Sequence, residues 1–410
     1  MDGTVYLVGG AVRDGILGVT PREKDWVVVG STPDELLARN FRQVGASFPV
    51  FLHPDTGEEY ALARTERKQG HGYHGFTVDF HPGVTLEEDL SRRDLTVNAM
   101  ARDESGRLID PFGGERDLEQ RVLRHVSPAF CEDPLRVLRV ARFAARFAEF
   151  GFQVHDSTMK LMQEMVASGE LEHLVPERVW AEFASAMSAS QPDVFIRVLR
   201  ECGALAVLLP EVDRLFGVPQ PERYHPEIDT GIHVLMTMNL AARLGGPAEV
   251  VFALLLHDLG KGLTPDTLLP SHIGHEKSGV PLVNDVCARL RAPGAFRDLA
   301  LKVCELHLRC HRLIEARPST VMKLIEDADL LRRPERVRDF IRACEADFRG
   351  RKGLEDRPYP QGDRLQAALR DVLAIRARDI GTEGLDGVQI GEKLRKARIK
   401  AIAGAADPAG

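Results

Sequence analysis

Apolar and polar residues follow two different patterns along the chain, and the change falls near residue 130. Before it, short runs rich in β-branched and aromatic residues, which predict strands, alternate with short helical stretches. After it, apolar positions recur at helical spacing in 133–150, 157–169, 176–188 and 193–205, and almost no strand pattern remains. These patterns predict an α+β fold, in which a small α/β head is followed by an all-α body.

The expected strands and helices of the head are short. The sequence predicts strands at VYLVGG, DWVVVG, FPVFLH and EEYALART, and helices at AVRDGILG and TPDELLARN. Thr32 is expected to cap the second helix, with Pro33 at its first position. The segment 64–76 contains several glycines and few apolar residues, so it is expected to be a loop.

The composition bounds the class of protein. The 410 residues are 44% hydrophobic, so the chain is expected to be globular and long enough for several domains. Its net charge of −7 argues against nucleic-acid binding over the whole surface, although a local basic face stays compatible with it. The six cysteines are scattered without a CxxC pair, which predicts a reduced, cytoplasmic protein. The start shows no signal-peptide pattern, and the apolar run 250–256 is too short for a membrane span.

Two carboxylates stand at the entrance of the second expected strand. Glu23 and Asp25 are one residue apart, so in a strand both side chains point to the same side. A divalent cation relieves their repulsion, and Mg²⁺ prefers one or two carboxylates together with water and substrate phosphates. Such a centre activates an attacking hydroxyl and stabilises a leaving pyrophosphate. The alternative is a strand entrance with ordinary surface charge.

The element before this strand favours a phosphate site. LVGGAVRDGILG reads as a strand, a Gly-Gly turn and the start of a helix. Gly9 and Gly10 allow a ligand to approach the backbone closely, and the helix start offers unpaired N–H groups to a phosphate. Arg13 lies in the first turn of that helix and adds a positive charge. The spacing differs from GxGxxG, so a dinucleotide site is not indicated.

Together these motifs resemble a known enzyme family. GGAVRD followed by EKDWVVVG is similar to the nucleotidyltransferase head of the bacterial CCA-adding enzymes, the class II, poly(A) polymerase-like tRNA nucleotidyltransferases. LEEDLSRRDLTVNAMA, IDPFGG and EDPLRVLRVARFAAR continue the match, and PERVWAE, HPEIDTGIH and LLHDLGKG extend it into a fused HD domain. The resemblance implies a polymerase β-like head at 1–140, a helical neck that binds nucleotide and tRNA at 141–225, an HD domain at 226–335 and a helical tail at 336–410.

The resemblance implies template-independent addition and repair of the 3′-terminal CCA of tRNA from CTP and ATP. It assigns Glu23 and Asp25 to catalysis as Mg²⁺ ligands, and Gly10, Arg13 and Arg93 to binding of the incoming nucleotide. The common family pattern has Asp at the first acidic position. Glu23, which stands there in this chain, keeps the charge and both oxygens, so metal binding is expected to survive.

Two points about the head stay open at the level of sequence. A third carboxylate is expected on a neighbouring strand, where Glu58 and Glu59 are both candidates. For RRDLTVNAMA, the alternative to nucleotide binding is a helix start capped by Asp94, with Arg92 and Arg93 in solvent.

Arginines recur on one face of the helix expected at 133–150. At about 100° per residue they fall within an arc of about 120°. These arginines are Arg136, Arg139, Arg142 and Arg146. A solvated basic face would explain them, whereas the resemblance assigns Asp133 and Arg136 to base recognition and Arg139 and Arg142 to phosphates or support of the pocket. A carboxylate accepts and a guanidinium donates, so such a pair suits cytosine and adenine and mismatches uracil and guanine.

A second group of polar residues lies within apolar helical sequence. His257 and Asp258 are adjacent, and burying such groups is costly unless they pair or bind a metal. Together with His233 and His307 they resemble the metal ligands of an HD phosphohydrolase domain. The alternative is a hydrogen-bonded His-Asp pair at the end of a helix. His272 and His275 are expected to be loop residues near the site.

The HD resemblance implies 2′,3′-cyclic phosphodiesterase, 2′-nucleotidase and phosphatase activity, with His257 and Asp258 as catalytic residues. It also implies a divalent transition metal, Ni²⁺ in this subgroup, which the ligands alone do not specify. Other functions consistent with the same motifs are an A-adding enzyme or poly(A) polymerase, and an HD hydrolase with a nucleotide-sensing head. The expected partners are tRNA, CTP and ATP, without a membrane, and a monomer and a homodimer both stay open.

Overall fold

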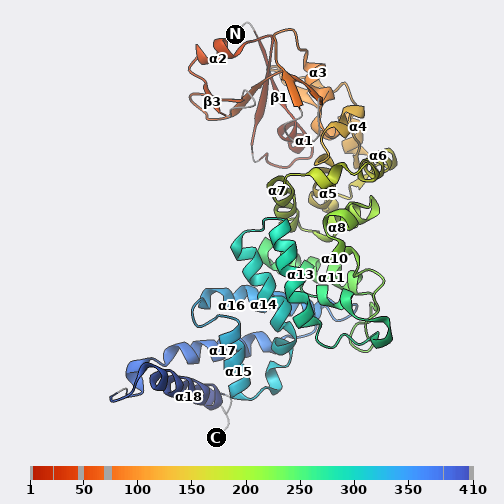
Figure 1. Cartoon of the computed structure of the whole chain (residues 1–410). Coiled ribbons are helices and arrows are strands. Elements are labelled where there is room, and N and C mark those ends of the chain that lie inside the picture. The colour runs from red at the N-terminus through yellow and green to blue at the C-terminus, as the bar shows by residue number, and fades with distance from the viewer. Residues whose placement is uncertain (1–2, 22, 45–49, 69–75, 382, 406–410) are drawn as a thin grey trace. The chain divides into compact units, whose positions relative to one another are not determined.

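The structure is a computed structural model that describes residues 3–21, 23–44, 50–68, 76–381 and 383–405. The chain forms two compact units (Figure 1). The first consists of Met1–Glu182 with Val194–Leu208, and the second of Phe183–Asp193 with Leu209–Gly410. Strands lie in the first unit and the second is helical, which confirms the predicted α+β class.

The first unit is built on a seven-stranded sheet with the order β3-β4-β5-β2-β1-β8-β9. Neighbouring strands run antiparallel except β2 and β5, which are parallel. The strands are β1 (Thr4–Val8), β2 (Asp25–Val29), β3 (Arg42–Val44), β4 (Val50–Leu52), β5 (Glu59–Leu62), β8 (Ala101–Arg102) and β9 (Leu108–Ile109). The one parallel pair places the starts of β2 and β5 side by side, which positions the first site described below.

The valine run of β2 explains why the sheet is buried on both faces. Val27 packs into one apolar cluster, with Val8 and Leu90, and Val28 packs into another, with Leu36 and Phe51. Because side chains alternate along a strand, a continuous apolar run supplies both faces. Short helices accompany the sheet: α1 (Gly10–Ile16), α2 (Pro33–Leu37), α3 (Leu86–Ser91) and α4 (Gly114–Glu119).

Two local predictions for the head have different outcomes. The capping prediction is confirmed, since Thr32 Oγ1 accepts a hydrogen bond from Glu35 N, Glu35 Oε2 accepts one from Thr32 N, and Pro33 is the first residue of α2. The predicted loop at 64–76 is partly wrong. Its flanks form antiparallel strands β6 (Thr65–Lys68) and β7 (Phe76–Asp79), and 69–75 lies outside the described residues. Threonine, phenylalanine and valine at these flanks favour strand.

Among the residues that the structure describes after the sheet, the regular elements are helical apart from one short parallel pair, β10 (Val122–Leu123) with β11 (Gln153–Val154). The helices that follow are α5 (Arg136–Arg146), α6 (Asp156–Ala167), α7 (Pro176–Met187), α8 (Asp193–Glu201), α9 (Ala204–Leu208) and α10 (Pro210–Asp213). In α5 the apolar residues between the arginines, among them Val137, Val140 and Ala144, are buried. This face fixes α5 against the protein and leaves its arginines on the opposite side.

The second unit packs around α12 (Ala248–Leu256). Residues 250–256 of this helix are fully buried, as expected for a helix that is apolar on all sides. The helices around and after it are α11 (Thr230–Arg243), α13 (His275–Arg289), α14 (Gly294–His311), α15 (Pro318–Asp327), α16 (Val337–Arg349), α17 (Pro360–Ala374) and α18 (Gly387–Ala405). Over the described ranges, no helix combines the length and apolar character needed to cross a membrane.

Candidate active sites

A cavity of about 780 Å³ opens at the edge of the head sheet, where β2 and β5 begin. Its lining combines carboxylates with many arginines, which is the charge arrangement expected for a metal-bound polyphosphate. The charged lining residues are Arg13, Glu23, Asp25, Glu59, Arg64, Arg92, Arg93, Asp94, Asp133, Arg136, Arg139, Arg142, Arg146 and Arg178. The predicted nucleotide-site residues of the head, including Gly10, therefore lie around one cavity.

The carboxylates stand on neighbouring strands. Asp25 and Glu59 are register partners in the parallel pair β2 and β5, and Glu23 lines the same cavity. Desolvation raises the pKa of Asp25, Arg93 lowers it and Glu23 raises it further. Glu58 is engaged elsewhere: it accepts a hydrogen bond from Trp26 Nε1 at 2.9 Å. The geometry thus favours Glu59 over Glu58 as the third carboxylate.

The glycine turn brings the backbone close to the arginines. Gly9 has φ +68°, and a Cβ there would lie 2.8 Å from Arg93 Nη1. A side chain at this position would be strained and would displace that guanidinium. Arg13 lines the cavity but is buried, donates from Nε to Asp14 at 2.8 Å, and packs over the Phe147 ring. These contacts with Asp14 and Phe147 hold the Arg13 guanidinium in place.

The arginines of RRDLTVNAMA are held by a buried carboxylate. Asp89 is fully buried and pairs with Arg92 at 2.6 Å and Arg93 at 3.2 Å. Asp94 caps no α-helix: its carboxylate accepts from Leu95 N at 2.8 Å and pairs with Arg139 at 2.8 Å. The alternative of a capped helix with solvated arginines is therefore wrong, because the segment forms only a short 3₁₀ turn at Thr96–Asn98.

The basic face of α5 points into the cavity. Beyond the Asp94–Arg139 pair, Arg142 Nε donates to Glu182 Oε2 and stacks over the Phe143 ring at 4.2 Å. Although burial would raise it, the Arg139 guanidinium lowers the pKa of Asp94 to about 2. The arginine arc is therefore held by acidic and aromatic partners rather than by solvent alone.

The side chains of Asp133 and Arg136, which are expected to recognise the base, contact other protein groups. Asp133 and Arg136 both line the cavity. The Asp133 carboxylate lies 2.7 Å from Arg178 Nη2 in α7. The Arg136 guanidinium donates to the backbone carbonyls of Ala129 at 2.7 Å and Arg92 at 2.6 Å. Arg178 was missed at the level of sequence although it lies in the quoted motif PERVWAE, because its own spacing carries no chemical signature.

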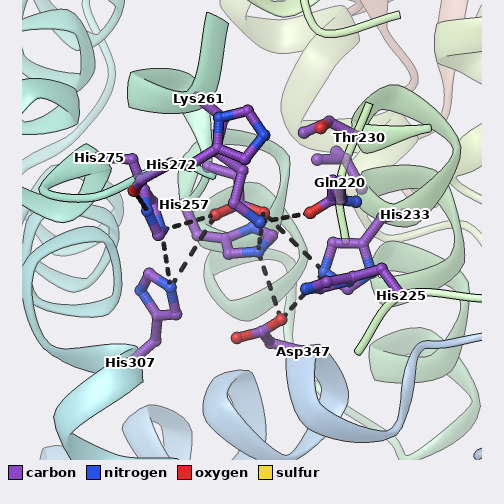
Figure 2. Close-up of polar contacts among 12 residues, drawn as sticks. Gln220, His225, Thr230, His233, His257, Lys261, His272, His275, His307 and Asp347 are labelled. Carbon is purple, nitrogen blue, oxygen red and sulfur yellow. Dashed lines mark hydrogen bonds and ion pairs between the residues drawn. The ribbon is translucent and has the colours of Figure 1, made fainter. Parts of the chain in front are cut away.

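A second site lies in the helical unit, where side chains from several elements converge (Figure 2). His233 comes from α11, His257 directly follows α12, His275 begins α13, His307 lies in α14 and Asp347 in α16. Asp258 follows His257, and all six side chains are buried. The four residues predicted from the HD resemblance are therefore brought together in one cluster.

Asp347 was not predicted. Its Oδ1 lies 3.0 Å from His233 Nε2 and 3.5 Å from His257 Nε2. The expectation that His275 is a loop residue is also wrong, since it is the first residue of α13 and its Nε2 lies 3.3 Å from Asp258 Oδ1. His272 does lie outside the helices, and its ring contacts Thr264 and the Pro219 carbonyl.

The electrostatics of this cluster couple its members. Although burial would lower it, Asp258 and Asp347 raise the pKa of His257 to about 10. Burial lowers the pKa of His307 to about 3, which keeps that imidazole neutral, the form that binds metals. Despite burial, the neighbouring imidazole of His257 holds the pKa of both carboxyls well below their usual range, and both are therefore ionised.

A cavity of about 730 Å³ leads to this cluster. Its wall includes Lys261, whose Nζ lies 2.6 Å from Asp258 Oδ2, and His275. The lining also includes Tyr224, Phe348 and Arg351, together with other basic residues. Cations and aromatic rings near a buried His/Asp cluster suit a phosphate ester that carries a base or sugar.

Family comparisons agree with this division into two sites. Residues 5–124 match the family model of the poly(A) polymerase head domain. Residues 151–216 match the model described as "Probable RNA and SrmB- binding site of polymerase A", and residues 230–334 match the HD domain. Head and body thus define a nucleotidyltransferase of the poly(A) polymerase class that carries an HD domain.

The particular family follows from relatives matched over nearly the whole chain. The multifunctional CCA protein of Thioalkalivibrio sulfidiphilus is 62% identical over 97% of this chain and 97% of its own. That of Alkalilimnicola ehrlichii is 59% identical over the same shares. This chain belongs to the multifunctional CCA protein family, as the motifs predicted. In fold it also resembles the Thermotoga maritima CCA-adding enzyme complexed with tRNA, with TM-score 0.62, 21% identity, and coverage of 98% of this chain and 88% of that one.

Proposed function

We propose that the head adds and repairs the 3′-terminal CCA of tRNA from CTP and ATP. We also propose that the helical second unit, called the HD unit below because it contains the HD match at 230–334, hydrolyses phosphate esters. The observation that carries the first activity is the single cavity in which Glu23, Asp25 and Glu59 share a space with an arginine wall. Membership of the multifunctional CCA protein family supports both activities.

The head carboxylates fit a hard divalent cation, for which we propose Mg²⁺. Glu23 and Asp25 would hold it, with Glu59 beside them, because carboxylate oxygens from adjacent strand starts suit such an ion. A cation bound there would supply neutralisation of the leaving pyrophosphate and activation of the tRNA 3′-hydroxyl.

The protein itself positions the nucleotide. The Gly9–Gly10 turn lets the triphosphate approach the backbone, while Arg93 and the α5 arginines provide donors to its oxygens. These guanidinium groups are already tied to Asp89, Asp94 and Glu182, so little further ordering is needed when the nucleotide binds.

We assign base choice to Asp133 and Arg136. Asp133 would accept from the exocyclic amino group of cytosine or adenine, and Arg136 would donate to the ring acceptor beside it. Arg178 holds the Asp133 carboxylate at 2.7 Å and orients it. Uracil and guanine reverse this order of donor and acceptor, so they would present an acceptor to Asp133 and a donor to Arg136.

For the HD unit we propose a metal-dependent phosphohydrolase acting on 2′,3′-cyclic phosphates, 2′-nucleotides and phosphomonoesters. The ligands proposed from sequence, His233, His257, Asp258 and His307, are joined by Asp347, whose carboxylate contacts the first two. Mixed imidazole and carboxylate donors fit a divalent transition metal, and Ni²⁺ is our candidate. Such an ion would supply a polarised water and charge neutralisation for a phosphate.

We further propose a cytoplasmic protein, monomeric or homodimeric, with tRNA as its macromolecular partner. All six cysteines are free, which suits a reducing compartment. The α5 arginines and the adjoining helices would contact tRNA through phosphates and shape.

The proposal is tested with tRNAs that lack the last one, two or three nucleotides, each incubated with CTP alone, ATP alone or both. We expect two C residues from CTP alone, one A only after the second C, and a halt after CCA. Extension by A on all three tRNAs, with no C, would instead identify an A-adding enzyme. A run of A residues would identify a poly(A) polymerase.

A further inference from the structure

Two groups of potential metal ligands meet in the HD cluster, whose histidines and Asp347 are labelled in Figure 2. The first group contains His233, His257 and Asp347, and the second contains Asp258, His275 and His307. In each group, the possible ligand atoms lie within 4.8 Å of one another. Four side chains would satisfy one tetrahedral ion, so a cluster of six exceeds what one such position requires.

The two oxygens of Asp258 face different groups. Asp258 Oδ2 lies 3.2 Å from His257 Nε2 and 3.9 Å from His233 Nε2. The other oxygen, Oδ1, lies 3.3 Å from His275 Nε2 and 3.9 Å from the Nε2 atom of His307. A carboxylate directed this way is suited to bridge two cations, one on each side.

The imidazoles are also oriented for metal binding. His257 Nδ1 contacts the Leu254 carbonyl at 2.7 Å, His275 Nδ1 the His272 carbonyl at 2.7 Å, and His307 Nδ1 the Val303 carbonyl at 3.0 Å. A backbone carbonyl only accepts, so each Nδ1 carries a proton, and Nε2 is the ring nitrogen directed into the cluster, where a bound cation would take its lone pair.

His233 follows the same logic with a different partner. Its Nδ1 lies 3.0 Å from Glu227 Oε1, and its Nε2 faces Asp347. In the second group, His275 Nε2 and His307 Nε2 lie only 3.4 Å apart. Two lone pairs directed at each other are unfavourable unless a cation or proton stands between them.

We propose that this centre holds two divalent cations bridged by Asp258, the first bound by His233, His257 and Asp347, and the second by His275 and His307. The inference rests on the proposed hydrolase function and deepens it. Lys261 does not replace the second cation, because its ammonium pairs with Oδ2 at 2.6 Å, whereas the close contacts of Oδ1 are imidazoles. Two bridged cations would supply a clamp for a phosphate ester and a polarised water.

The test counts ions in the full-length chain and asks whether they interact. The chain carries Asp25→Ala to weaken ion binding in the head, is stripped with a chelator, and is titrated with Mn²⁺ under electron paramagnetic resonance. We expect two tightly bound Mn²⁺ per chain with the spectrum of an exchange-coupled pair. His275→Gln and His307→Gln should each bind one ion and show an uncoupled spectrum.

The matched control is His272→Gln, whose ring lies nearby but contacts Thr264 and the Pro219 carbonyl. It should keep both ions and the coupling. One uncoupled ion in the parent, unchanged in His275→Gln and His307→Gln, would overturn the second cation and leave the proposed hydrolase standing. No tightly bound ion in a folded parent would overturn the metal-dependent hydrolase as well. Circular dichroism checks that each variant is folded, and the parent spectrum decides the question even where a variant is not.

Discussion

The two sites of this protein differ in how far their charged side chains are exposed to solvent. In the head, Glu23 and Asp25 are exposed at the start of a strand and line an open cavity. In the HD unit, His233, His257 and Asp258 have no exposed surface. Water solvates the head carboxylates when no ion is bound, whereas the buried cluster depends on its own ion pairs. Removing a ligand should therefore affect chiefly catalysis in the head, but both catalysis and stability in the HD unit.

The largest expected effect is on nucleotide addition. Asp25→Ala should lower the rate of CCA addition by about a thousandfold or more, because several kcal/mol of charge stabilisation is lost. The melting temperature should hardly change, since the side chain is exposed. The measurement is single-turnover extension of truncated tRNA. Glu23→Asp, which restores the common family residue, should keep substantial activity.

The matched control for this variant is Glu58→Ala on the same sheet edge. Glu58 contacts Trp26 and Lys24, so its removal should leave addition within a few fold of the parent. Near-parental extension by Asp25→Ala, or equal loss in Glu58→Ala, would show that the carboxylates have been wrongly assigned.

The next largest effect is on hydrolysis at the buried site of the HD unit, with nucleotide addition in the head left nearly unchanged. Asp347→Ala should lower hydrolysis of 2′,3′-cyclic nucleotides by at least about a hundredfold and should also destabilise the HD unit. Its removal takes away the 3.0 Å contact of the buried His233 Nε2 and one of the two carboxylate contacts of His257 Nε2. CCA addition by the folded variant should stay within about twofold. Asp339→Ala on the same helix, which pairs with Arg342 at 3.4 Å, is the control and should change neither activity.

A smaller effect concerns selection rather than rate. Asp133→Ala and Arg136→Ala should each weaken use of CTP and ATP by about tenfold to a hundredfold, since about 1–3 kcal/mol of recognition is lost. Use of UTP and GTP should fall less, so the preference for CTP and ATP over UTP and GTP should become smaller. Arg146→Ala, on the same face but paired with Asp14, should slow all four nucleotides alike. A uniform loss in the Asp133 and Arg136 variants would assign them a structural role.

The smallest effect is on acid stability of the head. The folded-state pKa of Asp94 is about 2, below the unfolded value of about 3.9. Its ionised form therefore contributes about 2.5 kcal/mol above the unfolded pKa, and this is lost as pH falls from about 4 to about 2. Asp94→Asn should be less stable in urea at pH 7, and the gap should narrow toward pH 3. If the difference in unfolding free energy between parent and variant did not change with pH, the ion pair with Arg139 would not be its cause.

How much could be predicted depends on how local each signal is. The head motifs are contiguous: the glycine turn and the acidic pair lie within a few residues of the elements they belong to. The third carboxylate could not be chosen from sequence, because Glu58 and Glu59 are adjacent and only the register of β5 against β2 separates them.

The remaining omissions have the same physical origin. Asp347 meets His233 and His257 only because α16 packs against α11 and α12, a contact that no local pattern encodes. Arg178 reaches Asp133 from another helix in the same way. His275 was expected in a loop, yet Gly274, with φ 82°, is the N-cap of α13 and His275 is the first residue of that helix.

The most direct test of the account measures both reactions on the same preparations of parent, Asp25→Ala, His257→Ala and the double variant. We predict that Asp25→Ala loses CCA addition and keeps cyclic-phosphate hydrolysis, that His257→Ala does the reverse, and that the double variant loses both. Loss of both activities in either folded single variant would contradict the account, because it would require one shared site.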